Sequence, residues 1–111
     1  MKEGFQTIKV KVGRDVAEDN ERVRIVREEI GQEREIYIDA NCGWDAETAI
    51  NAVNRMDEMG LNVAMFEQPT PDGDFAGMAR VRREIRPLVM ADDICFNFMH
   101  ALELIRTECC D

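Results

Sequence analysis

The chain has 111 residues, of which 45% are apolar and 33% charged, and this composition is typical of a globular protein with a single core. Its formal net charge of -9 repels phosphate backbones and anionic lipid surfaces, so neither nucleic acid nor a membrane is expected as a partner. No apolar run approaches the roughly 20 residues that span a bilayer, and no signal-peptide core follows the first residues. We therefore predict an intracellular, cytoplasmic protein.

The cysteines indicate neither a disulfide framework nor a zinc site. Cys42, Cys95, Cys109 and Cys110 form no CxxC pair and no zinc-ligand spacing. The neighbours Cys109 and Cys110 could bridge each other only under strain. We expect all four to be reduced thiols, as is usual inside the cell.

The first half of the chain predicts two units, each a strand followed by a helix. Alternating apolar residues predict a strand over Thr7–Val12, and apolar residues at helical spacing predict a helix that Asp15 caps and Gly31 ends. A second strand is expected over Glu35–Asp39. After a short loop, Asp45 is expected to cap a second helix.

The second half repeats the pattern twice. A strand is predicted over Val63–Glu67, followed by a helix that starts at Asp74 and cannot continue through Pro87. A fourth strand is predicted over Leu88–Ala91, and a fourth helix from about Asn97. The apolar residues of this last helix that we expect to face inward are Phe98, Ala101, Leu102 and Ile105.

Strands that alternate with helices predict a parallel sheet, because a short turn cannot return the chain to a parallel start. The fold class is therefore α/β. Four such units fit either an open doubly wound sheet or an arc of a (β/α)8 barrel, and the periodicity does not separate the two.

Charged residues stand at the end of each predicted strand. Lys9 and Lys11 belong to the first strand, and Asp39, Glu67 and Asp92 follow at intervals of 28, 28 and 25 residues from Lys11 onward. Each interval is about the length of one strand–helix unit. Parallel α/β folds bring the carboxyl ends of their strands to one rim, so we expect these side chains to meet there.

These residue types in this pattern indicate a metal-assisted proton transfer. Three unpaired carboxylates on one rim would raise one another's pKa, and a divalent cation would relieve that repulsion. Oxygen ligands favour Mg²⁺, with Mn²⁺ as a substitute. Lys9 and Lys11 point to the same face, and a lysine beside another cation has a lowered pKa that suits a base. Together these groups suit abstraction of a proton α to a substrate carboxylate.

The residues around these positions also match a known family. The four motifs are Lys9-Val10-Lys11, Asp39-Ala40-Asn41, Glu67-Gln68-Pro69 and Ala91-Asp92-Asp93. In this order and spacing they resemble the barrel domain of the enolase superfamily, in its mandelate racemase and muconate lactonizing enzyme branch. The muconate lactonizing side is the more similar of the two.

The resemblance implies a role for each matching residue. The positions that match the metal ligands are Asp39, Glu67 and Asp92. Lys11 matches the acid/base lysine, Lys9 matches its electrostatic companion, and Asn41 matches an asparagine that holds the substrate or metal-side groups. Asp93 departs from the family, which commonly has glutamate at this position.

The resemblance also implies that more chain is needed for activity. Its members have eight barrel strands and a separate capping domain, whereas this chain resembles only strands two to five. We therefore expect residues 1–111 to be a partial barrel domain of a longer isomerase or lyase, inactive alone. The reaction would be racemization, epimerization, cycloisomerization or dehydration of a small carboxylate substrate.

Two other interpretations remain open. The first is a non-catalytic half-barrel module that self-associates as a homo-oligomer through its exposed sheet edges. The second is an unrelated flavodoxin-like α/β domain, which would also collect carboxylates at its strand ends. The two lysines on the first strand argue against the second interpretation.

Overall fold

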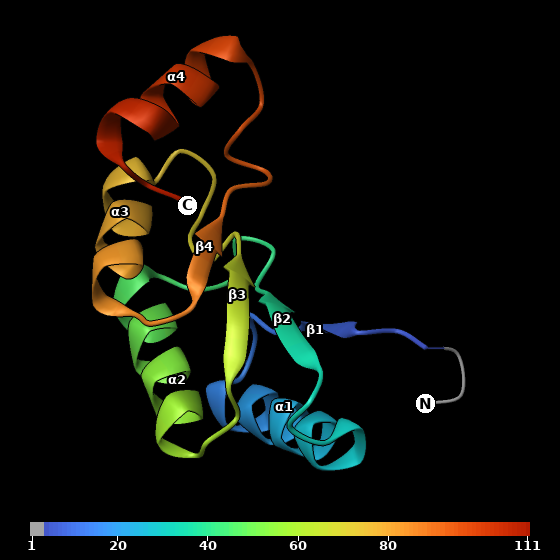
Figure 1. Ribbon diagram of the computed structural model, residues 1–111. Helices are drawn as coiled ribbons and strands as arrows, with labels where there is room; N and C mark the ends of the chain where they lie inside the picture. The colour runs from blue at the N-terminus through green and yellow to red at the C-terminus, as the bar shows by residue number, and fades with distance from the viewer. Residues whose placement is uncertain (1–3) are drawn as a thin grey trace.

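The computed structural model describes residues 4–111 and has four strands that alternate with four helices. The strands are β1 (Thr7–Lys11), β2 (Glu35–Asp39), β3 (Val63–Glu67) and β4 (Leu88–Met90). The helices are α1 (Val16–Ile30), α2 (Ala46–Glu58), α3 (Phe75–Glu84) and α4 (Phe98–Thr107). The predicted α/β class is confirmed, with every strand pair parallel (Figure 1).

The order of the strands separates a barrel arc from a doubly wound sheet. The four strands lie in the sheet in sequence order, β1-β2-β3-β4, so the direction of winding never reverses. Successive helices pack against one another, α1 on α2, α2 on α3 and α3 on α4. The strands rotate progressively from β1 to β4, as Figure 1 shows. This one-directional winding is that of consecutive units of a (β/α)8 barrel.

The core lies between the sheet and the helices. Aligned residues on the four strands, Val10, Ile38, Phe66 and Val89, are all buried in one row. Because side chains alternate along a strand, the next residue of each strand points to the opposite face. The residues next to this apolar row therefore face away from the helices.

The predicted helix starts are confirmed by their caps. Asp15, Asp45, Asp74 and Asn97 each accept a hydrogen bond from the backbone N–H three residues later. Such caps satisfy N–H groups that have no partner within the helix. They begin every helix shortly after a strand and so keep the loops at the strand ends short.

A buried arginine holds the opposite end of the sheet. Arg27 is 3% exposed, and its guanidinium donates to the carbonyls of Gly31, Arg34, Leu61 and Asn62 at 2.7–3.1 Å. Burial lowers the pKa of this arginine from its usual value. These bonds join the segments that enter β2 and β3, so the two strands are anchored at the end opposite the charged rim.

The fourth helix corrects one prediction. Phe98, Leu102 and Ile105 do not face inward, because their exposures are 74%, 45% and 76%, and Leu104 is the buried residue of α4. The helical period was right, but α4 packs on α3 and extends past the end of the sheet (Figure 1). In residues 4–111 no strand lies beyond β4 to cover this apolar face. No helix in this part of the chain is long and apolar enough to cross a membrane.

Candidate functional site

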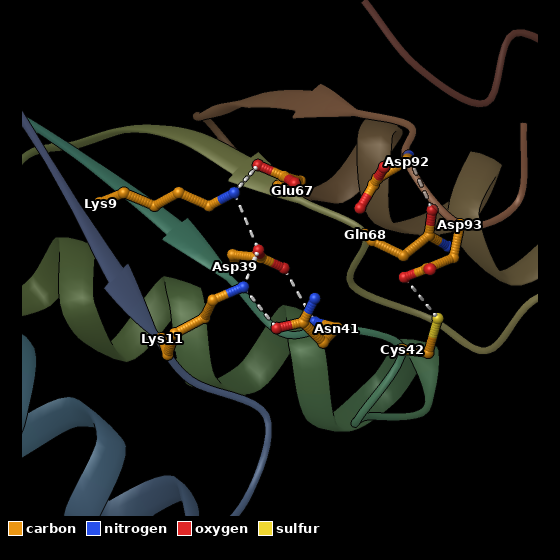
Figure 2. A network of polar contacts seen from close by, with 9 residues as sticks. All are labelled: Lys9, Lys11, Asp39, Asn41, Cys42, Glu67, Gln68, Asp92 and Asp93. Atoms are coloured by element: carbon orange, nitrogen blue, oxygen red, sulfur yellow. Dashed lines mark hydrogen bonds and ion pairs between the residues drawn. The ribbon is translucent and has the colours of Figure 1, made fainter.

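The sheet register places charged residues of three strands in one row. Lys11 aligns with Asp39, and Asp39 aligns with Glu67, on the face of the sheet opposite the apolar row. Lys9 lies two residues before Lys11 and points to the same face. Figure 2 shows these four side chains turned toward one another across the strand ends.

The two lysines pair with the carboxylates. Lys9 Nζ lies 3.0 Å from Asp39 Oδ2 and 2.6 Å from Glu67 Oε2. Lys11 Nζ lies 2.6 Å from the same Asp39 oxygen and 2.6 Å from Asn41 Oδ1. The carboxylate side chains are buried, at 1% and 9% exposure, whereas the lysines are 44% and 62% exposed. The acids thus form the floor of the site and the lysines its solvent-facing side.

This pairing reverses the sequence-based expectation for two pKa values. The Lys9 ammonium donates to Glu67, the larger effect, and to Asp39, and these bonds raise the pKa of Lys9 above its usual value. For Asp39, burial is the largest effect and acts to raise the pKa, but the bonds from Lys11, Lys9 and the Asn41 N–H together lower it. Among Lys9, Lys11, Asp39 and Glu67 the expected repulsion between like charges is offset, because each of these four groups has an opposite partner.

Asn41 completes this network from the loop after β2. Its backbone N–H donates to Asp39 Oδ1 at 2.9 Å, while its side-chain oxygen accepts from Lys11. The residue has a φ of 44°, in the left-handed region, which asparagine tolerates better than most residues. This backbone turn directs its side chain back to the rim, as Figure 2 shows.

Asp92 lies outside the network. The last residue of β4, Met90, aligns with Glu67, so Asp92 follows two residues beyond the row. It is exposed, and its backbone N–H donates to Gln68 Oε1 at 2.9 Å. Across residues 4–111, no three histidine, cysteine or acidic side chains are close enough together to hold a metal ion. The structure therefore brings together five of the six predicted site residues and leaves Asp92 apart.

The donor chemistry nevertheless fits a hard divalent cation. The buried Asp39 carboxylate has a lowered pKa and is therefore charged at neutral pH, which a cation ligand must be. Glu67 adds a second nearly buried carboxylate, and Asp92 offers a third on the adjacent loop. An all-oxygen set of this kind favours Mg²⁺ or Mn²⁺ over softer metals.

The sequence did not predict the hydrogen bonds of two residues in the rim loops, Gln68 and Cys42. Gln68 is fully buried although it is polar, and its side-chain amide makes three hydrogen bonds. The Cys42 thiol donates to the Asp93 carboxylate at 3.5 Å, which joins the loops after β2 and β4. The signal for Gln68 is its place directly after a buried strand, but two of its three partners, Asp92 and Ile94, are distant in the sequence.

Fold and rim together define a segment of a (β/α)8 barrel with lysines and carboxylates at the carboxyl ends of its strands, where enzymes of this architecture have their active sites. The family described as "Enolase C-terminal domain-like" matches residues 1–111. The chain belongs to this family.

Its relatives include characterised enzymes. The chain is 36% identical to the L-Ala-D/L-Glu epimerase of Bacillus subtilis, over 100% of this chain and 31% of that enzyme. A substrate-liganded structure of the Bacillus subtilis epimerase superposes with a TM-score of 0.95, over 99% of this chain and 31% of that one. The Enterococcus faecalis dipeptide epimerase, in complex with Mg and the dipeptide L-Leu-L-Tyr, superposes with a TM-score of 0.93 at 33% identity, over 99% of this chain and 30% of that one.

These matches confirm the resemblance seen in the sequence. The similar proteins are epimerases, racemases and cycloisomerases of the mandelate racemase and muconate lactonizing type. The chain spans about a third of the length of the relatives it matches.

Proposed function

We propose that this chain supplies the metal-binding wall and one acid/base group of an epimerase or racemase that acts at the carbon α to a substrate carboxylate. Residues 1–111 would serve as a partial barrel domain within a longer enzyme, completed by further strands and a capping domain. The observation that carries the proposal is the single row of Lys11, Asp39 and Glu67, with Lys9 on the same face.

In this proposal each rim residue has a distinct task. Lys11 takes or returns the α-proton, and its 62% exposure gives it access to a substrate above the sheet. Lys9 keeps positive charge next to Asp39 and Glu67, since its raised pKa holds it protonated at neutral pH. Asn41 orients the Lys11 ammonium through the bond at 2.6 Å.

The proposed cation ligands are Asp39, Glu67 and Asp92. When bound, Mg²⁺ would supply positive charge to the substrate carboxylate and make the neighbouring α-proton more acidic. Mg accompanies the dipeptide in the Enterococcus faecalis structure and in that of the Cytophaga hutchinsonii epimerase, which supports the assignment. The reaction class favoured for this chain is epimerization of a dipeptide or an N-acylated amino acid, as in its relatives.

Metal binding can be tested on the 111-residue chain itself. We expect saturable Mg²⁺ binding by calorimetry in the parent, strong weakening in Asp39→Asn, and no change in Asp57→Asn. Asp57 is a matched control because it pairs with Arg86 away from the rim. Equal affinity in the parent and Asp39→Asn would overturn the cation assignment.

Catalysis needs the rest of a barrel. The matched segment of the Bacillus subtilis epimerase can be replaced with this chain, and exchange of the substrate α-proton can be followed by NMR in D₂O. We expect exchange with the parent segment and a loss of at least a hundredfold with Lys11→Met. A folded chimera in which Lys11→Met exchanges at the parent rate would contradict the role of Lys11.

The exposed apolar side chains of α4 favour a second candidate, a module that self-associates without catalysis. Phe98 and Ile105 are about three-quarters exposed, and such side chains gathered on one helix mark contact surfaces. Sedimentation separates the two candidates. A discrete oligomer that binds no Mg²⁺ supports the module, whereas a Mg²⁺-binding chain supports the enzyme segment.

A further inference from the structure

Gln68, the residue directly after β3, connects three loops of the rim. Its backbone N–H donates to the Met90 carbonyl at 2.9 Å, and its carbonyl accepts from the Cys42 N–H at 3.1 Å. Its side-chain Nε2 donates to the Thr70 carbonyl at 3.0 Å. The residue is fully buried and has a φ of 38°, in the left-handed region. It therefore ties together the segments that follow β2, β3 and β4. Figure 2 shows its side chain next to Asp92.

The side-chain oxygen of Gln68 holds the Asp92 backbone. Oε1 accepts from the Asp92 N–H at 2.9 Å and from the Ile94 N–H at 3.2 Å. The Cys95 N–H donates to the Asp92 carbonyl at 2.9 Å, which closes a turn around the same point. Ile94 is fully buried, so its N–H would be left without a partner if Gln68 were removed.

The chemistry of this position suits an amide. One end must accept two N–H groups, and the other must donate to the Thr70 carbonyl. Glutamine provides both, whereas a carboxylate would set an acceptor against that carbonyl and an apolar side chain would satisfy neither end. The hydrogen-bonding groups of Gln68 thus match those that surround it.

The position of the Asp92 carboxylate depends on this backbone anchor. Within residues 4–111, no hydrogen bond from another residue holds the Asp92 carboxylate, which is exposed. Glu67 is covalently joined to Gln68, so one residue fixes the backbone on which each of these two acids stands. The Gln68 side chain therefore adds a contact between the backbone beside Glu67 and that of Asp92, beyond the pairing of β3 with β4.

We propose that Gln68 is a positioning residue for the cation site, acting through Asp92. This inference rests on the proposed function, because it takes Asp92 as a cation ligand. Partners that orient metal ligands without touching the metal commonly contribute 10- to 100-fold in affinity. Gln68 is expected to contribute within this range, entirely by holding the Asp92 loop against β3.

The test uses Mn²⁺ as the probe, with free Mn²⁺ measured by electron paramagnetic resonance on the 111-residue chain. We expect Gln68→Met and Asp92→Asn each to weaken binding roughly 10- to 100-fold. The Mn²⁺ affinity of the double variant should equal that of the single variant with the lower affinity, because both changes remove the same ligand. Gln32→Met, a change at an exposed glutamine in the loop before β2, should bind like the parent.

A second readout follows the anchor itself and is independent of the metal. Amide hydrogen exchange at Ile94 should be slow in the parent and at least tenfold faster in Gln68→Met, with exchange at Ile38 in β2 unchanged. Gln68→Glu keeps the acceptor and should retain protection at Ile94. If Gln68→Met does not fold, fast Ile94 exchange in folded Gln68→Glu would contradict the anchor, because the acceptor is still present.

The outcomes separate this inference from the proposed function. Parent-like Mn²⁺ affinity in Gln68→Met, or losses that add fully in the double variant, would overturn the positioning role and leave the cation site intact. Unchanged Ile94 exchange in folded Gln68→Met, or Ile94 exchange in Gln68→Glu as fast as expected for Gln68→Met, would overturn the anchor. No Mn²⁺ binding by the parent chain would overturn the cation site and the inference with it.

Discussion

The inner strands and the β4–α4 end of the molecule use similar residues with opposite results. On β2 and β3 the apolar side chains Ile38 and Phe66 are fully buried, and the acids Asp39 and Glu67 are nearly so. On α4, Phe98 is 74% exposed, and Asp92 in the preceding loop is exposed as well. The difference is one of neighbours, because β2 and β3 each have a strand on both sides whereas β4 has β3 alone within residues 4–111.

The comparison shows what a flanking strand provides. Asp39 lies between Lys9 and Lys11 of β1 on one side and Glu67 of β3 on the other, so its charge is compensated although it is buried. Asp92 lies two residues beyond this row, has no such partner within residues 4–111 and is exposed to solvent. A site residue at the carboxyl end of a strand is therefore set in place by the strands beside it, as much as by its own strand.

The largest loss of stability is expected in the core, at Phe66. Phe66→Ala should destabilise the chain by about 3–5 kcal/mol, because it leaves a cavity in a fully buried site. Phe98→Ala removes the same group from an exposed position and should change the unfolding free energy by less than about 0.5 kcal/mol. Urea denaturation measures both. Equal losses would mean that the α4 face is covered in solution.

A second pair of variants compares the buried Arg27 with Arg106 on the exposed surface of α4. Arg27→Met should cost about 2–3 kcal/mol, since four carbonyls at the start of β2 and β3 lose their donors. Arg106→Met, on the exposed surface of α4, should have a far smaller effect because its pair with Glu103 is solvated. Thermal unfolding of the two variants gives the comparison. A mild Arg27→Met variant would show that water replaces the guanidinium.

A smaller effect is expected in the pH dependence of stability. The lowered pKa of Asp39 means that the unfolded state binds a proton more readily than the folded one. Its stabilising contribution is thus complete above the ordinary aspartate pKa of about 3.9 and is lost as the pH falls through the lowered value. Asp39→Asn should flatten this acid limb in urea titrations between pH 2 and 6. A limb parallel to that of the parent would contradict the pairing with Lys9 and Lys11.

The smallest change in stability is expected on the apolar face of α4. Ile105→Ser should alter the unfolding free energy by less than about 0.5 kcal/mol, because the side chain is 76% exposed. The same variant should bind less of a hydrophobic dye, as measured by fluorescence. Leu104→Ser is the matched change at the buried residue of this helix and should cost more. Equal costs would show that both sides of α4 are packed.

The sequence predicted most of the fold because its signals are local. The strand over Glu35–Asp39, the strand over Val63–Glu67 and the four helix caps follow from alternation and from single capping residues. Phe98 was misplaced for a related reason. Helical spacing shows that apolar residues share a face, but it does not show whether another element covers that face.

The candidate site divides in the same way. The sequence alone identified Lys9, Lys11, Asp39 and Glu67 as site residues on a common rim. It could do so because strand length and unit spacing fix where each strand ends. Only the tertiary structure decided how they pair, why Lys9 has a raised pKa and why a buried Gln68 holds the Asp92 loop. These ion pairs and hydrogen bonds depend on strand register and on contacts between residues far apart in the chain. Local sequence patterns do not determine either of these.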